Sequence, residues 1–330
     1  MRKLATVRRI DSIRPIEGAD AIECAVVGGW TVVTKKGDFR AGDLAVYCEI
    51  DSWIPHELAP FLSKGQEPRE YNGVKGERLR TVKLRGQLSQ GLLIAAMGTF
   101  PEGTDMTEAL GIQKYEPLIP TQLAGEVKGP FPIFIPKTDQ ERIQNLANEL
   151  EQWKADSLTW EVTEKLDGSS MTVYYHNGEV GVCSRNLELR DTPDNTMWKV
   201  AHRDGIVTLL YDEDRSIAIQ GELVGEGIQG NPYRIRGQSF YVFDVYLIDQ
   251  GRYMLPQERA EFCEFHQLLH VPILTNKITN SDTTVADLLV AAEGKSEMNF
   301  DAEREGLVFK CIDKNISFKA ISNKLLLKNG

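Results

Sequence analysis

The sequence has few features of secreted, membrane-bound or metal-clustering proteins. It contains only five cysteines among 330 residues, and no two of them stand in C-x-x-C spacing. Neither a disulfide framework nor a zinc site is therefore predicted. No apolar run approaches the roughly 20 residues that a membrane-spanning helix needs, and the first residues lack the apolar core of a signal peptide. We expect a cytoplasmic protein of two domains, with no membrane and no protein partner implied.

An excess of positive charge is also missing, because the net charge is −10 at pH 7. Such a balance argues against a simple polyanion-binding protein. Residues 1–126 hold 16 Lys and Arg against 17 Asp and Glu, and the remainder holds 22 against 31. Nucleic-acid contacts in the acidic part must then be local, or offset by metal ions. The densest basic run is as consistent with phosphate contact as with a solvated strand pair. Its members are Lys75, Arg78, Arg80, Lys83 and Arg85.

Turn signals divide the chain into two differently patterned parts. Short β-like runs separated by Gly, Asp and Pro dominate residues 1–120 and predict a five-stranded OB-type barrel. A linker rich in Pro and Gly is predicted over residues 121–136. A capping box formed by Thr138 and Glu141 then predicts the start of a helix. Strand-like runs dominate again within residues 137–330, with helical stretches interposed.

The sharpest motif is Lys165-Leu166-Asp167-Gly168, which stands between two strand-like runs. A lysine nucleophile must be unprotonated, whereas at its reference pKa of about 10.4 it is an ammonium ion. Burial or a nearby cation lowers that pKa. The pattern K-x-D-G alone occurs by chance in roughly one protein in ten of this length. An exposed lysine that leads into a hairpin would explain it equally well.

Further short runs follow this lysine in a characteristic order, although each taken singly is more often structural. They are Ser184-Arg185-Asn186, Gly221-Glu222-Leu223, Phe243-Asp244, Glu305 to Lys310, and Phe318-Lys319. In this order the set resembles the covalent nucleotidyltransferase superfamily of ATP-dependent ligases and mRNA capping enzymes, over roughly residues 137–328. Within it, the chain is most similar to the RNA ligase 2-like branch, and in particular to the RNA ligase 5 family, which carries an N-terminal OB domain.

The place of the additional domain narrows this resemblance. Only 11 residues follow Lys319, whereas DNA ligases and capping enzymes of the superfamily usually carry an OB domain after the last motif. The resemblance implies an ATP-dependent RNA ligase of the α+β class. Its OB-type barrel would be followed by an adenylyltransferase domain of antiparallel sheets flanked by helices, in residues 137–330. A DNA ligase, a GTP-using capping-type transferase and a non-catalytic nucleic-acid-binding protein are the alternatives. The sequence Lys319-Ala320-Ile321 lacks the second lysine of the family's K-x-K pattern, so Lys310 or Lys324 is expected to supply part of that charge.

The resemblance implies ATP, Mg²⁺ or Mn²⁺, and an AMP group carried covalently on Lys165. The AMP would pass to a 5′-phosphate, which a 3′-hydroxyl then attacks. The implied substrate is RNA or an RNA-containing nicked duplex in which the 3′-hydroxyl belongs to RNA. The roles implied by matched position are metal binding or catalysis for Glu305, adenine stacking for Phe243, ribose contact for Glu222, α-phosphate contact for Lys310 and Lys319, binding of a phosphate or reacting end for Arg185, and a place in the nucleotide site for Glu164 and Gly168. Asp167 is expected to act in catalysis by binding the ribose or the metal ion, or else to shape the turn. Arg142, on the helix predicted from Thr138, is expected to orient the pyrophosphate in place of a C-terminal OB domain.

Overall fold

The computed structural model describes residues 3–96, 98–116, 126–278 and 282–328. The chain divides into two compact units. The first contains residues 1–118, 144–148 and 326–330, and the second contains residues 119–143 and 149–325. Among the described residues, no helix has the length and apolar character needed to cross a membrane.

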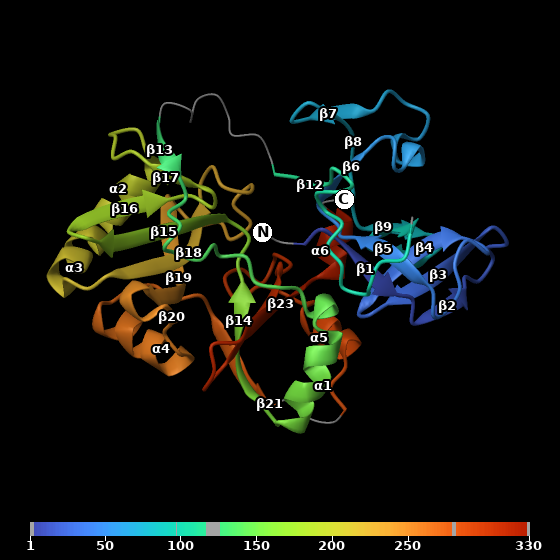
Figure 1. The fold of residues 1–330 in the computed structure, drawn as a ribbon. Helices are drawn as coiled ribbons and strands as arrows, with labels where there is room; N and C mark the ends of the chain where they lie inside the picture. Colours follow the sequence, from blue (N-terminus) through green and yellow to red (C-terminus); the bar gives the residue numbers. More distant parts are fainter. Residues whose placement is uncertain (1–2, 97, 117–125, 279–281, 329–330) are drawn as a thin grey trace. The chain divides into compact units, whose positions relative to one another are not determined.

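The first unit is built from short antiparallel strands, as the closely spaced turn signals predict (Figure 1). The strands are β1 (Ala5–Arg9), β2 (Ser12–Pro15), β3 (Ile22–Val27), β4 (Trp30–Lys35), β5 (Leu44–Cys48), β6 (Ser52–Pro55), β7 (Arg69–Tyr71), β8 (Val74–Arg78), β9 (Val82–Leu84), β10 (Gln87–Ser89), β11 (Leu92–Ala95) and β12 (Gln113–Lys114). They pair in the orders β1-β5-β11, β2-β3-β4, β10-β9 and β12-β6-β8-β7. A 3-10 helix, η1 (Pro60–Ser63), lies between β6 and β7.

Alternating burial along these strands builds the core of the first unit. On β4, Trp30 and Val32 are buried and their neighbours are more exposed, as expected for a strand with one face inward. Trp30 and Tyr47 are fully buried, and their ring centroids lie 5.7 Å apart. Gly91 packs against the Tyr47 ring, since a Cβ at this position would come within 2.3 Å of Tyr47 Cε2. A larger residue would therefore push the start of β11 away from this core.

The second unit contains two antiparallel sheets (Figure 1). The seven-stranded sheet has the order β13 (Val127–Pro130), β17 (Leu187–Leu189), β16 (Glu179–Cys183), β15 (Ser169–His176), β18 (Ile217–Gly225), β19 (Gln238–Leu247) and β20 (Arg252–Tyr253). The four-stranded sheet has the order β21 (Ile273–Ile278), β14 (Thr159–Lys165), β22 (Gly306–Cys311) and β23 (Ser317–Ile321). The described helices of the chain are α1 (Ala147–Ala155), α2 (Thr196–Arg203), α3 (Ile206–Glu213), α4 (Pro256–Phe265), α5 (Val285–Ala291) and α6 (Asn323–Lys328), with 3-10 turns η3 (Ile143–Asn145) and η4 (Ile248–Gln250).

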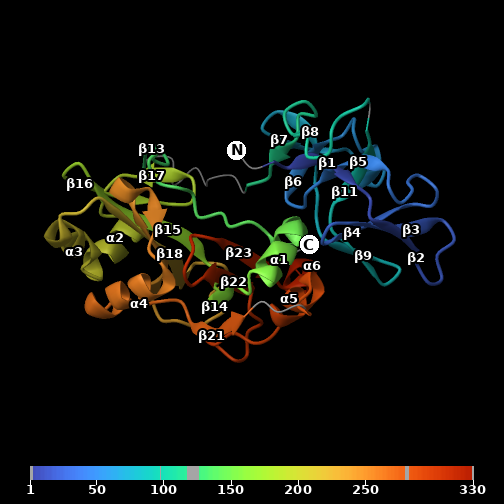
Figure 2. The ribbon, with the colours of Figure 1, turned by 60° about the horizontal axis from the view of Figure 1, so that its bottom comes forward.

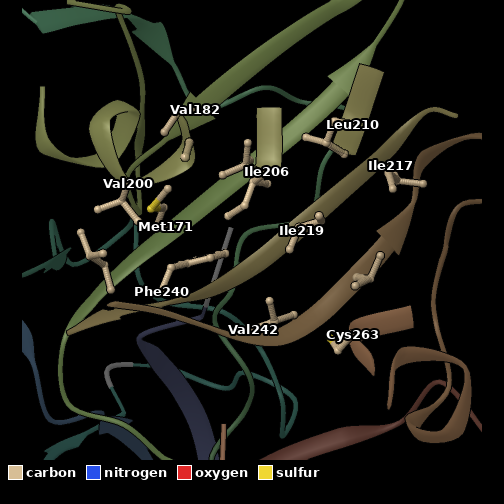
Figure 3. Packing of buried hydrophobic residues seen from close by; sticks show 14 of the residues in the cluster. Met171, Val182, Val200, Ile206, Leu210, Ile217, Ile219, Phe240, Val242 and Cys263 are labelled. Carbon is tan, nitrogen blue, oxygen red and sulfur yellow. The ribbon is translucent and has the colours of Figure 1, made fainter. Parts of the chain in front are cut away.

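The largest hydrophobic core of the second unit lies where α2 and α3 pack on the seven-stranded sheet. The side chain of Asn195 caps α2 by accepting hydrogen bonds from the backbone of its first turn. Ile206 and Leu210 stand four positions apart and so face the same side of α3. Figure 3 shows them directed towards sheet residues that include Ile219 and Phe240. Helix α1 packs similarly on the four-stranded sheet, where the rings of Trp153 and Phe318 stack with centroids 5.3 Å apart.

The segment before α1 differs from the sequence prediction. The helix predicted to begin at Thr138 begins later, with η3 at Ile143 and α1 at Ala147. The hydroxyl of Thr138 is hydrogen-bonded to that of Ser170 at 2.8 Å, and the carbonyl of Glu141 accepts a hydrogen bond from the backbone of Lys319. These long-range bonds replace the capping box, because a backbone held against two sheets cannot also close a first helical turn.

Part of the predicted linker also belongs to the second unit. Residues 127–130 form β13 at the edge of the seven-stranded sheet, and residues 121–125 lie outside the described part of the chain. Phe131 and Ile135 are buried against Tyr174 and Ala218. The Pro- and Gly-rich composition indicates an irregular backbone here, but its apolar side chains anchor that backbone to the sheet.

Candidate active site

Lys165 lies at the last position of β14, where the chain passes from the four-stranded sheet to β15 of the seven-stranded sheet. Residues directly opposite each other in antiparallel strands have side chains on the same face. The relevant pairs are Lys165 with Gly306, Glu161 with Lys310, Thr163 with Val308, and Val308 with Lys319. The register therefore places Lys165, Lys310 and Lys319 on one face of this sheet.

The turn after Lys165 has a fixed path. Leu166 is buried, and the backbone N–H of Asp167 donates a hydrogen bond to the hydroxyl of Tyr233 at 2.6 Å. Gly168 passes so close to β18 that a Cβ would lie 2.4 Å from the carbonyl oxygen of Leu223. The glycine of the motif is thus required by the close approach of two backbones. This anchoring fixes where Lys165 and Asp167 stand relative to each other.

Carboxylates surround the amine of Lys165. Its Nζ donates a hydrogen bond to Glu305 Oε2 at 2.6 Å, and Glu305 immediately precedes β22. Burial alone lowers the pKa of Lys165, but the charges of Glu305, Glu222 and Asp167 outweigh it and raise that pKa above its ordinary value. In the protein alone, Lys165 is accordingly an ammonium ion held in an ion pair.

The same cluster makes two of its carboxyl groups hard to ionise. Burial raises the pKa of Glu222 to about 8, with Lys165 opposing the shift and the other carboxylates adding to it. Burial and the neighbouring Glu305 raise the pKa of Asp167 to about 6. Buried acids that repel one another gain stability from any added cation, because the cation favours their charged forms. The cluster is therefore electrostatically suited to a further positive charge.

Phe243 owes its position to an irregularity in β19. The register moves from Gln220–Asp244 to Gly221–Val242, so Phe243 is the extra residue of a β-bulge. It is half-buried and packs beside the cluster that includes Leu166 and Tyr233. A ring presented in this way at the edge of a site can stack on a planar ligand such as a nucleobase.

The side chain of Lys310 is held by contacts with this bulge. Its buried ammonium group is hydrogen-bonded to the carbonyl oxygen of Phe243 and ion-paired with Asp244, and it lies 5.8 Å from the Phe243 ring centroid. Burial lowers the pKa of Lys310 to about 8, against the opposing effect of Asp244. Lys310 could reach a phosphate only by leaving these partners, so in this state it supports the aromatic ring.

Asp139 connects two other predicted site residues. Its Oδ1 lies 2.9 Å from Lys319 Nζ, and its Oδ2 lies 3.6 Å from Arg185 Nη2. Burial lowers the pKa of Lys319 to about 8, Asp139 opposes the shift, and the charges of Arg142 and Lys165 add to it. Arg142 lies beside Lys319 through a parallel backbone bridge. The structure therefore brings Lys319, Arg185 and Arg142 together near Lys165, with half of the Arg185 side chain exposed.

Two further sequence candidates lie away from the amine of Lys165. Successive side chains of a strand alternate between faces, so that of Glu164 points to the opposite face from Lys165. Glu164 is buried there and accepts a hydrogen bond from the backbone N–H of Glu297. Lys324, one of two proposed substitutes for the missing second lysine, is exposed and pairs with Glu303 at 3.3 Å.

The basic run of the first unit does not form one uniform basic face. Lys75 is paired with Glu67 at 2.7 Å, and Arg78 with Asp51 at 2.6 Å. Arg80 lies between β8 and β9 and lines a groove within this unit. Lys83 and Arg85 belong to the exposed hairpin that joins β9 to β10.

Several residues that hold the site together were not predicted as site residues. Besides Asp139 and Tyr233, these include Arg259 on α4, which is completely buried. Arg259 forms an ion pair with Glu161, and its Nε donates a hydrogen bond to His270 Nε2 at 2.8 Å. Burial and the Arg259 charge lower the pKa of His270 to about 4, so it accepts this bond as a neutral ring. A buried arginine within a charged helix has no sequence signal that separates it from an exposed one.

Comparison with known proteins adds family evidence to this geometry. The model of the RNA ligase family matches residues 158–324, and an OB-fold domain model matches residues 4–96. Solved structures of Naegleria gruberi RNA ligase are 48% identical to the chain and cover 99% of it. One, determined with PPi, has a TM-score of 0.92 and is itself covered over 99% of its length. A lysine-to-alanine variant with ATP and Mn has the same TM-score, identity and coverage. No curated protein matches the chain. The expected fold, an N-terminal OB domain followed by an α+β domain of antiparallel sheets, is confirmed.

Proposed function

The chain belongs to the RNA ligase family, and we propose that it seals RNA 3′-hydroxyl and 5′-phosphate ends with ATP through an AMP group carried on Lys165. The observation that supports this most is the hydrogen bond of Lys165 Nζ to Glu305 within a cluster of carboxylates, beside the half-buried ring of Phe243. Solved structures of the Naegleria gruberi enzyme hold ATP, AMP and Mn, which supports the same nucleotide and a divalent ion here.

The first proposed step is attack of Lys165 Nζ on the α-phosphorus of ATP. A phosphorus–nitrogen bond forms, the bond to the bridging oxygen breaks, and pyrophosphate leaves with the electron pair. Glu305 Oε2 accepts a hydrogen bond from Nζ, so it orients the amine and is the nearest base for its proton. Lys319, whose Nζ is held by Asp139, is placed to offset phosphate charge, and Arg142 to orient the pyrophosphate. Positioning and charge compensation account for most catalysis of phosphoryl-type transfers.

The carboxylates of the site fit a divalent ion that is shared with the nucleotide. Among the described residues, no group of three or more His, Cys, Asp or Glu side chains could hold a metal ion by itself. Mg²⁺ is usually held by one or two carboxylates together with substrate phosphates and water. Glu305 and Asp167 are the residues proposed to hold it. Such an ion would supply positive charge that lowers the pKa of Lys165 and neutralises the phosphates.

The adenosine part of the nucleotide is assigned to the seven-stranded sheet. We assign Phe243 to stacking on adenine, because the bulge presents its ring beside the site. Glu222 is assigned to the ribose hydroxyls, since a carboxyl with its raised pKa can both donate and accept hydrogen bonds. Gly168 lets the turn after Lys165 pass close to β18, beside Glu222.

The later steps act on RNA. The AMP passes from Lys165 to a 5′-phosphate, and a 3′-hydroxyl then attacks that phosphate and releases AMP. Arg185, anchored by Asp139 but half exposed, is placed to bind the phosphate of the reacting end. We propose that the substrate is a nick in a duplex whose 3′-hydroxyl strand is RNA, and that basic residues of the OB domain add phosphate contacts.

The covalent step can be tested with radiolabelled ATP and GTP. Wild-type protein is expected to take label from ATP into an acid-labile, alkali-stable adduct visible on a denaturing gel. Lys165→Ala should take none, whereas Lys199→Ala, which removes an exposed lysine from α2, should be labelled normally. Labelling from GTP, or end joining by Lys165→Ala, would contradict the proposal.

The substrate can be tested with a matched set of nicked duplexes that differ only in the sugar on each side of the nick. Ribose at the 3′-hydroxyl side should be required for efficient sealing. Equal sealing of deoxyribose ends would instead identify a DNA ligase.

A further inference from the structure

A groove of about 870 Å³ lies entirely within the OB domain. Its walls are formed by β4, by η1 with the start of β7, and by β8 to β11. The β9–β10 hairpin lies beside β4 (Figure 2), where Ser89 Oγ accepts a hydrogen bond from the backbone N–H of Val33 at 2.9 Å. This attachment gives the hairpin a defined place beside the groove, which we call the OB groove.

Large apolar side chains are exposed along the OB groove. The ring of Phe61 on η1 is 66% exposed, and Val82 and Leu84 on β9 are 42% and 43% exposed. Val82 and Leu84 stand two positions apart on the same strand, so both point to the same side. Exposed apolar groups that gather in one concave place mark a binding site more often than scattered ones do.

Cationic side chains that form no ion pair within the described part of the chain line the groove beside these apolar groups. Five basic and three acidic residues line the OB groove. Glu67 is paired with Lys75, and Glu77 with Arg69, while Asp38 is the third of these acids. Over the part of the chain that the structure describes, no ion pair joins a carboxylate to the other cations that line the groove apart from Arg78, which pairs with Asp51. These cations are Lys35, Lys64 and Arg80.

The combination of exposed apolar side chains and these cations distinguishes between the classes of partner that the groove could bind. Protein interfaces are depleted of lysine at their apolar centres, so Lys35 and Lys64, which line the same groove as Phe61, disfavour a protein partner. An A-form duplex presents phosphates and 2′-hydroxyls but keeps its bases stacked inside, where an aromatic ring cannot reach them. Unpaired nucleotides offer both an exposed base face for the ring and phosphates for the cations.

We propose that the OB groove binds unpaired nucleotides of the RNA substrate, with a base stacked on Phe61 and phosphates bound by Arg80 and its neighbouring lysines. The inference rests on the proposed function, because it names the part of the RNA that the OB domain holds. It makes the enzyme prefer nicks that are flanked by a single-stranded or looped segment, a preference that the Lys165 site does not provide.

The test measures binding of full-length protein to two fluorescein-labelled RNAs without ATP. One is an oligouridylate of about twelve nucleotides, within the range that OB domains bind. The other is a blunt hairpin whose loop is replaced by a non-nucleotide linker, so that it has no unpaired nucleotide. Both carry a 5′-hydroxyl and a blocked 3′ end, so no chemistry can follow. Phe61→Ala should weaken oligouridylate binding about fivefold or more, as loss of one base–aromatic stack predicts. Hairpin binding should change less than about twofold.

Matched variants distinguish the loss of base stacking on Phe61 from a general effect of removing an exposed aromatic ring. Phe300→Ala removes a ring of the second unit that is 69% exposed, and it should bind both RNAs as wild type does. Phe61→Trp should restore oligouridylate binding, whereas Phe61→Leu should not, because leucine lacks a π-face. Arg80→Ala should reduce the slope of log affinity against log salt by about 0.7, the value for one phosphate contact on a single strand.

The outcomes distinguish this inference from the proposed function. Unchanged oligouridylate binding by Phe61→Ala, equal loss on the hairpin, or equal loss with Phe300→Ala would each overturn it. All groove variants should still take label from ATP onto Lys165, which also shows that they are folded. Failure of wild-type labelling would refute the proposed covalent step and leave the binding comparison valid.

Discussion

Replacing Asp139 with asparagine is expected to slow formation of lysyl-AMP most strongly at high pH. Burial lowers the pKa of Lys319 to about 8, and Asp139, 2.9 Å from its Nζ, opposes that shift. Asparagine keeps the shape of the side chain but removes the charge that favours the ammonium form. The pKa of Lys319 should therefore fall further. Since a lysine is charged only below its pKa, the variant loses the phosphate-binding cation at a lower pH than wild type does.

The size of the effect follows from the fraction of Lys319 that is charged. At pH 8, a group with a pKa of about 8 is half charged. Loss of an adjacent opposite charge shifts a pKa by about one unit or more, which leaves roughly a tenth of Lys319 charged. We expect lysyl-AMP formation to be about fivefold slower than wild type at pH 8, and near wild type below about pH 6.

The assay is single-turnover labelling from ATP over a range of pH, reported as the ratio of variant to wild-type rate. The titration of Lys165 is common to both proteins to a first approximation and largely cancels in this ratio. Asp156→Asn, on an exposed carboxylate that accepts a hydrogen bond from Gln152, is the matched control and should give a flat ratio near one. A flat, low ratio for Asp139→Asn would mean that Asp139 only orients Lys319. A ratio that recovers towards high pH would refute the electrostatic reasoning altogether.

Three further changes probe the framework of the site. Gly168→Ala should reduce labelling from ATP at least about tenfold, because a Cβ 2.4 Å from a backbone carbonyl oxygen must displace the turn. Gly129→Ala should be neutral in the same gel assay, since a Cβ at Gly129 would have no described atom within 4 Å apart from those of its chain neighbours. Arg259→Met leaves the buried Glu161 carboxylate without its cation, and should lower the free energy of unfolding by about 3–5 kcal/mol in urea titrations. Adding Glu161→Gln to that variant should recover part of the loss, and no recovery would mean that the pair is not what stabilises α4 on the sheet. Phe243→Ala should raise the KM for ATP about fivefold or more, as loss of one base–aromatic stack predicts, and an unchanged KM would place adenine elsewhere.

The strands were predictable because their signals are local. Runs such as Trp30–Lys35 alternate buried and more exposed side chains, and glycine or aspartate ends them. The helix predicted at Thr138 failed for a non-local reason, because Ser170 and Lys319 provide stronger partners for that segment than its own next turn does. Propensity counts only interactions within a segment, so it cannot anticipate bonds made to two other strands.

The order of the motifs predicts candidate residues that the structure brings together around Lys165, but it does not predict the groups that hold them. Asp139 and Lys319 stand 180 positions apart, and nothing within either segment indicates the pairing. Likewise, the bulge that presents Phe243 exists only in the register between β18 and β19. An isolated strand sequence does not reveal which of its residues will be the extra one.

The charge state of Lys165 shows most clearly what depends on the folded site. Sequence reasoning requires an amine whose pKa is lowered by burial or by a nearby cation. Burial does act in that direction, but the three carboxylates outweigh it and keep Lys165 protonated in the protein alone. The same carboxylates have raised pKa values of their own at Glu222 and Asp167, so they gain most from an arriving cation. Lysine and carboxylates are thus mutually stabilised in an unreactive form, and the positive charge that accompanies ATP would relieve both at once. Under the proposed mechanism, such a site would release Lys165 as a nucleophile only when the nucleotide is bound.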